Sequence, residues 1–257
     1  MPRSPILLSA AVGLSAAALF VSTASARPLE TILQSHVFEI CADPDNMPYS
    51  SRDGDRHGIL ADVGQAVAQK LGVDAKITWI PSREYLRKTQ CDAVPAVAII
   101  DGDPVKGATR PYTKSHSVLV VAQTHRPTNA IDDFRDEHVA VPSGSLAHHL
   151  MIKAGIPVWV RFLDDTAILN AVESGEADAG IVNQGSVDWY NATHPDKPLR
   201  IERSVRLDPS LDYAVAFGLR KADQALTDRV DDLIGQMMTD GELEKIFQRY
   251  GVTYLSP

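Results

Sequence analysis

Hydrophobic and polar residues alternate along the first half of the chain in blocks that predict strands and helices in turn. Val37–Ala42 is a short apolar run typical of a buried strand. Apolar residues then recur at helical spacing over Ile59–Leu71, and a glycine ends the run. Strands at 75–79 and 91–99 follow, with a short helix at 82–89 between them. This strand-helix alternation predicts a parallel sheet with helices on both faces.

A second unit with the same alternation follows Pro127. Its predicted strands are residues 138–141, 158–162 and 179–183, and its helices end near residues 154 and 173. Further apolar strands are predicted before and after it, at 118–122 and 213–219. The chain then ends in two apolar helical stripes, at 226–237 and 243–250, which have no strand of their own. We therefore expect this tail to return to the first unit.

The returning tail makes the first lobe discontinuous. We expect residues 27–121 and 214–257 to form lobe 1 and residues 122–213 to form lobe 2, with crossings near Val121 and Tyr213. Each lobe is expected to be a mainly parallel sheet flanked by helices. Two lobes with paired hinge strands are suited to closing on a ligand.

The first 26 residues have the features of a cleaved secretion signal. Arg3 supplies a basic start, residues 6–21 are apolar, and Ala-Ser-Ala at 24–26 is a cleavage site. We expect a soluble periplasmic chain of 231 residues that starts at Arg27. The alternative is an uncleaved membrane anchor, for which the apolar stretch is short.

Charge and cysteine content narrow the expected environment and partners. Without Arg3 the chain has 24 basic and 33 acidic residues, and this net charge of −9 disfavours nucleic acid and anionic lipid surfaces. Two cysteines in an exported protein, Cys41 and Cys91, favour a disulfide. The alternative is two separate buried thiols.

Motifs of common enzymes and metal sites are missing from the sequence. It has no His-Glu-x-x-His, no Gly-x-Ser-x-Gly and no Gly-Lys-Ser phosphate loop. His148 and His149 would face different sides of a helix, and the Asp101 and Asp103 pair is more typical of a turn than of a cation site. We expect neither catalysis nor a bound metal.

The segment Cys-Ala-Asp-Pro-Asp-Asn-Met-Pro-Tyr-Ser, at 41–50, lies between the first strand and the first helix. Open α/β sheets bind ligands at the carboxyl ends of their strands, so this polar and aromatic segment predicts a ligand mouth. Asp43, Asn46 and Tyr49 are its candidate ligand contacts, and Asp101 and Asn183 are further candidates outside this segment. Tyr49 would stack on the ligand or, alternatively, pack on Pro48 at the rim.

Several short segments, in this order along the chain, resemble the type II periplasmic solute-binding proteins of family 3, which serve ABC importers. They are Asn-Met-Pro-Tyr at 46–49, Cys-Asp-Ala-Val at 91–94, Thr-Arg-Pro-Tyr at 109–112, Val-Pro-Ser-Gly-Ser at 141–145, Gly-Glu-Ala-Asp at 175–178 and the tail at 241–251. The resemblance covers nearly all of the chain after the leader. It implies the two-lobed fold, a non-enzymatic binding role, a monomer and an ABC permease as partner.

A closer resemblance is to the accessory proteins of quinoprotein alcohol dehydrogenases, of the MxaJ and XoxJ type. It rests on residues 41–50, 91–92, 109–112, 217–221 and 249–254. It implies a role in methanol oxidation, as an accessory or maturation factor of a dehydrogenase dependent on pyrroloquinoline quinone (PQQ), or as a binder of PQQ. The segments at 101–105 and 183–185 differ from the subgroup's usual residues, which puts a shared ligand in doubt.

The residues that grip an amino acid in family 3 are replaced in this chain. Amino-acid binders hold the carboxylate with an Arg about ten residues before the Pro-Tyr pair. Counting back from Tyr112 gives Gly102, which lies between Asp101 and Asp103. The Asp that holds the ammonium is replaced by Asn183. The resemblance therefore implies a solute other than a standard α-amino acid.

An anionic ligand such as PQQ, with three carboxylates, would need cationic groups or free N–H groups in the cleft. Ser143, Gly144 and Ser145 begin a helix, where free N–H groups favour an anion, although a plain helix cap is the alternative. The candidate cations, chosen by position, are Arg52, Arg56, Arg83 and Arg110. We expect the dehydrogenase-associated role, with an ABC importer component for a small polar solute as the alternative.

Overall fold

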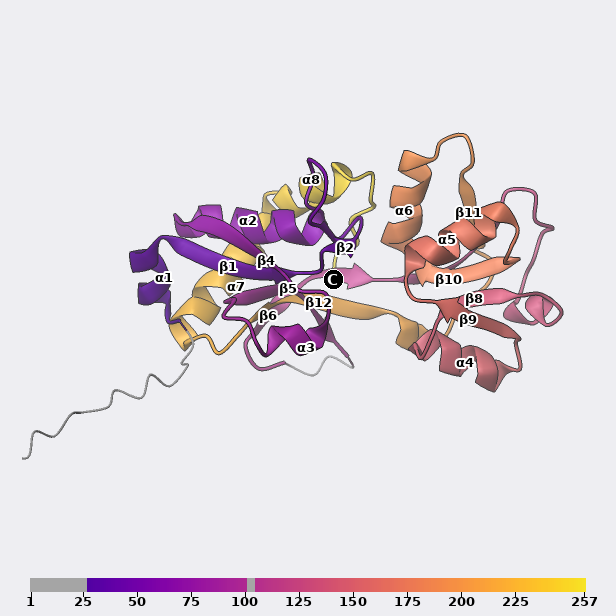
Figure 1. Cartoon of the computed structure of the whole chain (residues 1–257), viewed down its shortest axis with the longest axis horizontal. Coiled ribbons are helices and arrows are strands. Elements are labelled where there is room, and N and C mark those ends of the chain that lie inside the picture. The colour runs from indigo at the N-terminus through magenta and orange to yellow at the C-terminus, as the bar shows by residue number, and fades with distance from the viewer. Residues whose placement is uncertain (1–26, 101–104) are drawn as a thin grey trace, which may run out of the picture.

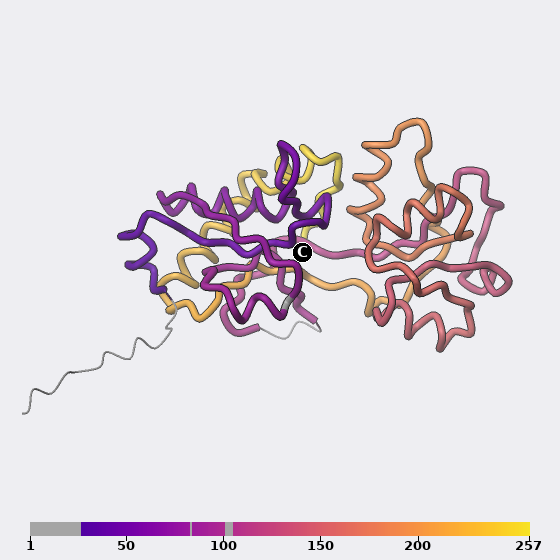
Figure 2. Tube along the Cα trace, viewed as in Figure 1, coloured from indigo at the N-terminus to yellow at the C-terminus, as the bar shows by residue number. Residues whose placement is uncertain are grey.

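The computed structural model describes residues 27–100 and 105–257. Within this part the chain forms two lobes that lie side by side, and both ends of the described chain belong to lobe 1 (Figure 1). Two extended segments join the lobes, one leaving lobe 1 and one returning to it (Figure 2). The predicted leader, residues 1–26, and Asp101 lie outside the described residues.

Lobe 1 is built on a five-stranded mixed sheet. Its strands are β1 (Val37–Ala42), β4 (Asp74–Trp79), β5 (Ala93–Ile99), β6 (Ala108–Ser115) and β12 (Tyr213–Leu219). They lie in the order β4-β1-β5-β12-β6. β1 is parallel to β4 and β5, whereas β12 is antiparallel to β5 and β6. A two-stranded ribbon, β2 (Asp45–Asn46) and β3 (Ser50–Ser51), forms the predicted mouth after β1.

The helices of lobe 1 come from both ends of the chain. They are α1 (Leu29–Ser35), α2 (Ile59–Leu71), α3 (Arg83–Leu86), α7 (Gln224–Thr239) and α8 (Glu242–Gln248). One apolar core joins α2 and the tail helices to the sheet, through residues such as Val63, Phe217, Val230 and Ile246. The tail therefore returns to lobe 1, because its apolar stripes have no other sheet to cover them.

Lobe 2 repeats this plan with a second five-stranded mixed sheet in the order β11-β7-β10-β8-β9. Its strands are β7 (Ser117–Ala122), β8 (Val139–Pro142), β9 (Val158–Phe162), β10 (Ala179–Asn183) and β11 (Leu199–Ile201). Its helices are α4 (Leu146–Ala154), α5 (Asp165–Ser174) and α6 (Gln184–Thr193), with short 3-10 turns at Ile131–Phe134 and Pro209–Leu211. Alternate residues of β7 enter two separate cores, Val118 and Val120 on one face and Leu119 and Val121 on the other.

The structure confirms the two-lobed α/β architecture but corrects two details of the prediction. The sheets are mixed and not mainly parallel, because β12 and β7 run against their neighbours. The first crossing lies at His116 and not near Val121, so β7 belongs to lobe 2. The crossing is misplaced because β6, which carries Thr-Arg-Pro-Tyr, has no clear apolar periodicity and is not predicted as a strand, so that β7 takes its place in the predicted first lobe.

The two crossings are joined to each other at the hinge. The His116 Nδ1 lies 2.8 Å from the Asp212 Oδ2, and the Ser117 N–H donates to the other Asp212 oxygen at 3.1 Å. On the lobe 1 side Tyr213 pairs with Ser115 across the β12–β6 ladder. The hinge is therefore a short two-stranded segment, which allows the lobes to rotate while their separation stays fixed.

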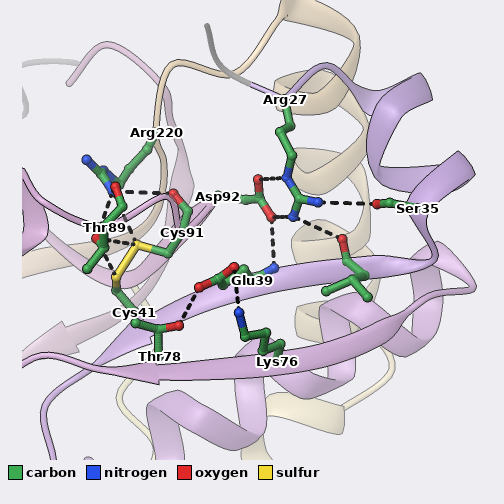
Figure 3. Close-up of polar contacts among 11 residues, drawn as sticks. Arg27, Ser35, Glu39, Cys41, Lys76, Thr78, Thr89, Cys91, Asp92 and Arg220 are labelled. Atoms are coloured by element: carbon green, nitrogen blue, oxygen red, sulfur yellow. Dashed lines mark hydrogen bonds and ion pairs between the residues drawn. A yellow bond between two sulfur atoms is a disulfide. The ribbon is translucent and has the colours of Figure 1, made fainter. Parts of the chain in front are cut away.

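The predicted disulfide between Cys41 and Cys91 is confirmed, and it is part of a polar cluster between β1 and the segment before β5 (Figure 3). The buried Asp92 carboxylate accepts hydrogen bonds from the Arg27 guanidinium, one of them 2.9 Å long, and from the Glu39 N–H at 2.8 Å. These contacts and the disulfide fasten the segment before β5 to β1. The strand that leads into the mouth is thereby fixed at its base.

We expect the double variant Cys41→Ala/Cys91→Ala to fold and to be less stable. The disulfide closes a loop with a sequence separation of 50 residues. In the chain-entropy model such a loop contributes about 4 kcal/mol, because the cross-link restricts the unfolded chain. Urea unfolding with and without a reductant would measure the effect. A free energy of unfolding for the wild type that is insensitive to reductant would contradict the prediction.

Candidate ligand cleft

A cleft of about 540 Å³ lies between the two lobes, beside the hinge. Residues of the mouth, the crossings, lobe 2 and the C-terminal segment all contribute to its wall. They include Asp43, Asp45, Asn46 and Tyr49 from the mouth, Lys114, Ser115 and Tyr213 from the crossings, Asp164, Asp165 and Asn183 from lobe 2, and Val252 and Leu255 near the C-terminus. This volume is that of a small-molecule site.

The charged side chains in the described cleft wall are mostly acidic. Four aspartates, Asp43, Asp45, Asp164 and Asp165, stand against one basic residue, Lys114. Like charges gathered in a partly enclosed site disfavour a polyanion and favour a cation or a neutral polar molecule. The described wall contains no arginine, so it offers no planar fork for a carboxylate.

Four of the residues predicted from sequence are brought together in this wall. Asp43, Asn46 and Tyr49 line it from lobe 1, and Asn183 lines it from the end of β10 in lobe 2. The mouth reaches the cleft because the β2–β3 ribbon folds back over the end of β1, around a cis peptide bond between Met47 and Pro48. The carboxyl end of β1 therefore faces the other lobe, as the sequence predicts.

The Ser143–Ser145 turn serves as a helix cap in this structure. Ser145 Oγ accepts a hydrogen bond from the His148 N–H at 3.1 Å. The three N–H groups proposed for an anion all have partners inside the chain: Ser143 donates to the Phe162 carbonyl, Gly144 to His148 Nδ1 and Ser145 to the Pro142 carbonyl. Of the two predicted roles, the geometry matches the cap.

The predicted cations whose side chains are described lie outside the cleft wall. Arg110 holds Asp231 of α7 through two nitrogens on the outside of lobe 1, and this pairing outweighs partial burial and lowers the pKa of Asp231. Arg52 lies on the exposed loop after the mouth, and Arg56 donates to the Arg249 carbonyl at 2.9 Å. Arg83 begins α3, but its side chain, like Asp101, is outside the described part.

Asn183 is the polar centre of the contact between the lobes. Its Oδ1 accepts a hydrogen bond from the Tyr49 hydroxyl of lobe 1 and another from the Gly185 N–H, at 2.9 Å, so that it also caps α6. Its Nδ2 donates to Ser115 Oγ in the crossing strand at 2.6 Å. One neutral side chain thus links the mouth, the hinge and lobe 2.

Asp165 supports this centre from behind, and no sequence motif points to it. Its carboxylate accepts hydrogen bonds from the Asn183 N–H at 3.0 Å and from Ser186 Oγ at 2.8 Å. Burial raises the pKa of Asp165, although these two hydrogen bonds act in the opposite direction. The only signal in the sequence is its place in the first turn of α5, after the Asp164 cap.

Two α/β lobes that face each other across a cleft and share a double hinge define the class of proteins that close on small ligands. Residues 38–253 match the model of the bacterial extracellular solute-binding proteins, family 3. The match spans most of the chain, so this protein belongs to that family. The predicted family is therefore confirmed, while the dehydrogenase-associated subgroup stays a prediction.

Two relatives are named as binding proteins for amino acids. The chain is 26% identical over 266 residues to the lysine/arginine/ornithine-binding periplasmic protein of Escherichia coli, covering 97% of each chain. It is 28% identical over 148 residues to the L-cystine-binding protein TcyJ of Bacillus subtilis, covering 54% of this chain and 52% of that protein.

Among solved structures, an ancestral amino acid-binding protein described as a precursor of cyclohexadienyl dehydratase matches with a TM-score of 0.67 and 22% identity. The match covers 86% of this chain and 98% of that chain, and it shows the shared fold. Over the residues that the structure describes, we find no helix with the length and apolar character needed to cross a membrane.

We expect Asp165→Asn to flatten the dependence of stability on pH. Burial raises the pKa of Asp165 in the folded protein above the ordinary Asp value of about 4. At pH values between these two pKa values, the folded protein therefore binds more protons than the unfolded chain. Stability from this group is therefore lost as pH rises through that window. Asparagine keeps the carbonyl acceptor and carries no charge, so the variant should lose less stability than the wild type between acidic and neutral pH.

The matched control is Asp164→Asn, because Asp164 is exposed and its cap on the Ala167 N–H is retained by asparagine. Urea unfolding of both variants and the wild type at a series of pH values would measure the difference. An Asp165→Asn profile parallel to that of Asp164→Asn would show that Asp165 does not carry the effect.

Proposed function

We propose that this protein is the periplasmic substrate-binding component of an ABC importer for a small polar solute that is neutral or positively charged and is not a standard α-amino acid. The observation that carries this proposal is the charge of the cleft. Its described wall has four aspartates, one lysine and no arginine. The family assignment supports a binding role, because the matched family consists of extracellular solute-binding proteins.

The contacts in the cleft favour a solute without an α-carboxylate. A carboxylate is best held by a bidentate guanidinium, and the described wall has none. In lobe 2 the amide oxygen of Asn183 already accepts hydrogen bonds from Tyr49 and Gly185. A solute with an amine, amide or hydroxyl group meets instead the carboxylates of Asp43 and Asp45, which are exposed in the mouth.

Two relatives support the general class of solute. The Escherichia coli relative is a lysine/arginine/ornithine-binding protein, and the Bacillus subtilis relative binds L-cystine. Both names describe small nitrogen-containing solutes. The difference proposed for this chain is the missing carboxylate grip, which rests on residues of this cleft and not on the relatives.

A role beside a PQQ-dependent dehydrogenase remains a prediction from the sequence resemblance. The cleft opposes PQQ as its ligand, since three carboxylates would face Asp43, Asp45, Asp164 and Asp165. The predicted cations Arg52, Arg56 and Arg110 do not contribute to the wall. An accessory role would therefore use an outer surface of the protein, and co-purification with the dehydrogenase would test it.

The proposal is tested by thermal-shift screening and calorimetry of the mature protein with four solute groups: small amines, α-amino acids, organic acids and PQQ. A ligand that binds only the folded form raises the melting temperature. We expect an amine or a neutral polar solute to do so. Tight binding of PQQ or of a dicarboxylate would overturn the proposed charge preference.

For a cationic solute we expect Asp43→Asn to weaken binding about tenfold, the equivalent of about 1.4 kcal/mol, because one attractive charge is removed from the mouth. Asp53→Asn is the matched control, since the Asp53 side chain is 85% exposed on the next loop and lies outside the cleft wall. Equal losses in both variants, measured by calorimetry, would indicate a general effect of net charge and not a contact in the cleft.

A further inference from the structure

The two lobes touch each other through their own side chains in the cleft, beside the first crossing. The Tyr49 hydroxyl of lobe 1 donates to the Asn183 oxygen of lobe 2. This contact has a steric requirement: a Cβ added at Gly185 would lie 2.5 Å from the Tyr49 hydroxyl oxygen and 3.2 Å from Val252. Only a glycine at the start of α6 leaves room for Tyr49 to reach Asn183.

A second contact between the lobes lies next to the first, on helix α6. Trp189 packs against the lobe 1 core, with its ring 6.0 Å from that of Tyr250. The Arg56 guanidinium of lobe 1 stands 5.6 Å from the centre of the Trp189 ring and 5.7 Å from that of Tyr250. The Thr253 N–H donates to Asp188 of α6 at 2.9 Å. Helix α6 is thus seated on the C-terminal segment of lobe 1.

We propose that these two contacts form a latch that closes the lobes without a bound solute. Every partner in the latch belongs to the chain itself. The inner contact, in the cleft, consists of Tyr49, Asn183 and Gly185. The outer contact, on helix α6, consists of Arg56, Asp188, Trp189 and the segment at 250–253. A solute-dependent binding protein needs the solute to bridge its lobes, whereas here Tyr49 makes that bridge. Tyr49 and Gly185 are therefore positioning residues that set the balance between open and closed forms.

The latch is also bonded to the hinge, so that movement of the hinge and breaking of the latch are coupled. Asn183 Nδ2 is bonded to Ser115 Oγ, and Ser115 pairs with Tyr213 in the returning crossing. Rotation of the lobes away from each other must break the Tyr49–Asn183 hydrogen bond and withdraw Trp189 from Tyr250. One partly buried hydrogen bond and one aromatic contact are of the size that shifts such an equilibrium.

The test uses the mature protein with no solute added, so its outcome is independent of the proposed import function. Trp79 and Trp159 are replaced by phenylalanine, which leaves Trp189 as the only tryptophan of the three in the chain. Small-angle scattering then reports the separation of the lobes, and Trp189 emission with acrylamide quenching reports the outer contact. In the parent we expect a radius of gyration that matches the closed form and a shielded Trp189.

Two variants weaken the latch in different ways. Tyr49→Phe removes the donated hydrogen bond and keeps the ring, and Gly185→Ala displaces the hydroxyl by steric contact. Each should increase the open-to-closed ratio about fivefold, which corresponds to a hydrogen bond of about 1 kcal/mol. The radius of gyration and the quenching of Trp189 should both rise. Because Gly185→Ala adds a better helix former to α6, its opening would not come from loss of the helix.

Tyr85→Phe is the matched control, because it removes the same hydroxyl group at another position. Tyr85 lies on α3, its side chain is 50% exposed, and it is outside the cleft wall. It should leave scattering and emission unchanged. The proposal is overturned if the parent scatters as an open form without solute, or if Tyr49→Phe and Gly185→Ala both match the parent. Opening in all three variants would also overturn it, since the effect would then not depend on the latch.

Discussion

The whole arrangement depends on a double crossing that confines the two lobes to rotation about one short axis. β6 passes through His116 directly into β7, and the chain returns through Asp212 into β12. The His116–Asp212 pair is about half exposed, so on its own it stabilises the hinge by no more than about 1 kcal/mol. The ladders on either side, which pair Tyr213 with Ser115 and Ser117 with Asn183, fix the geometry. Because Ser115 also holds the Asn183 side chain, the hinge and the cleft share one hydrogen-bond network.

That network favours a neutral residue over a charged one at position 183. A carboxylate there would be charged and would stand close to the partly buried Asp165, whose own pKa burial already raises. Asparagine avoids a second charge and supplies one acceptor and one donor, which are used by Tyr49 and Ser115. In this chain the neutral side chain at position 183 takes part in the contact between the lobes. Asp43 and Asp45 are the exposed acidic residues that the mouth contributes to the cleft wall.

Most of the fold could be predicted from periodicity and the order of the elements. β1, α2, β9 and β10 begin and end close to the predicted residues, because each is bounded by a glycine or a polar turn and buries a regular apolar face. Other elements gave weaker signals. The strand β6 carries Thr-Arg-Pro-Tyr and looks like a loop, and α6 has few apolar residues, of which Trp189 packs against the other lobe. Neither pattern shows its partner, since that partner is distant in sequence.

The sequence by itself determined the α/β class, the family resemblance, the cysteine pair and the place of the mouth after β1. These follow from local propensity, short motifs and the rule that sheets bind ligands at the ends of their strands. Only the tertiary structure decided that Arg110 and Ser143–Ser145 serve internal contacts, that Asp165 lies behind Asn183, and that Tyr49 reaches across to lobe 2. The physical reason is that the charge of the cleft wall and the partner of a side chain depend on residues that are far apart in the sequence. Tyr49 and Asn183 are more than a hundred positions apart, and only folding brings them within hydrogen-bond distance.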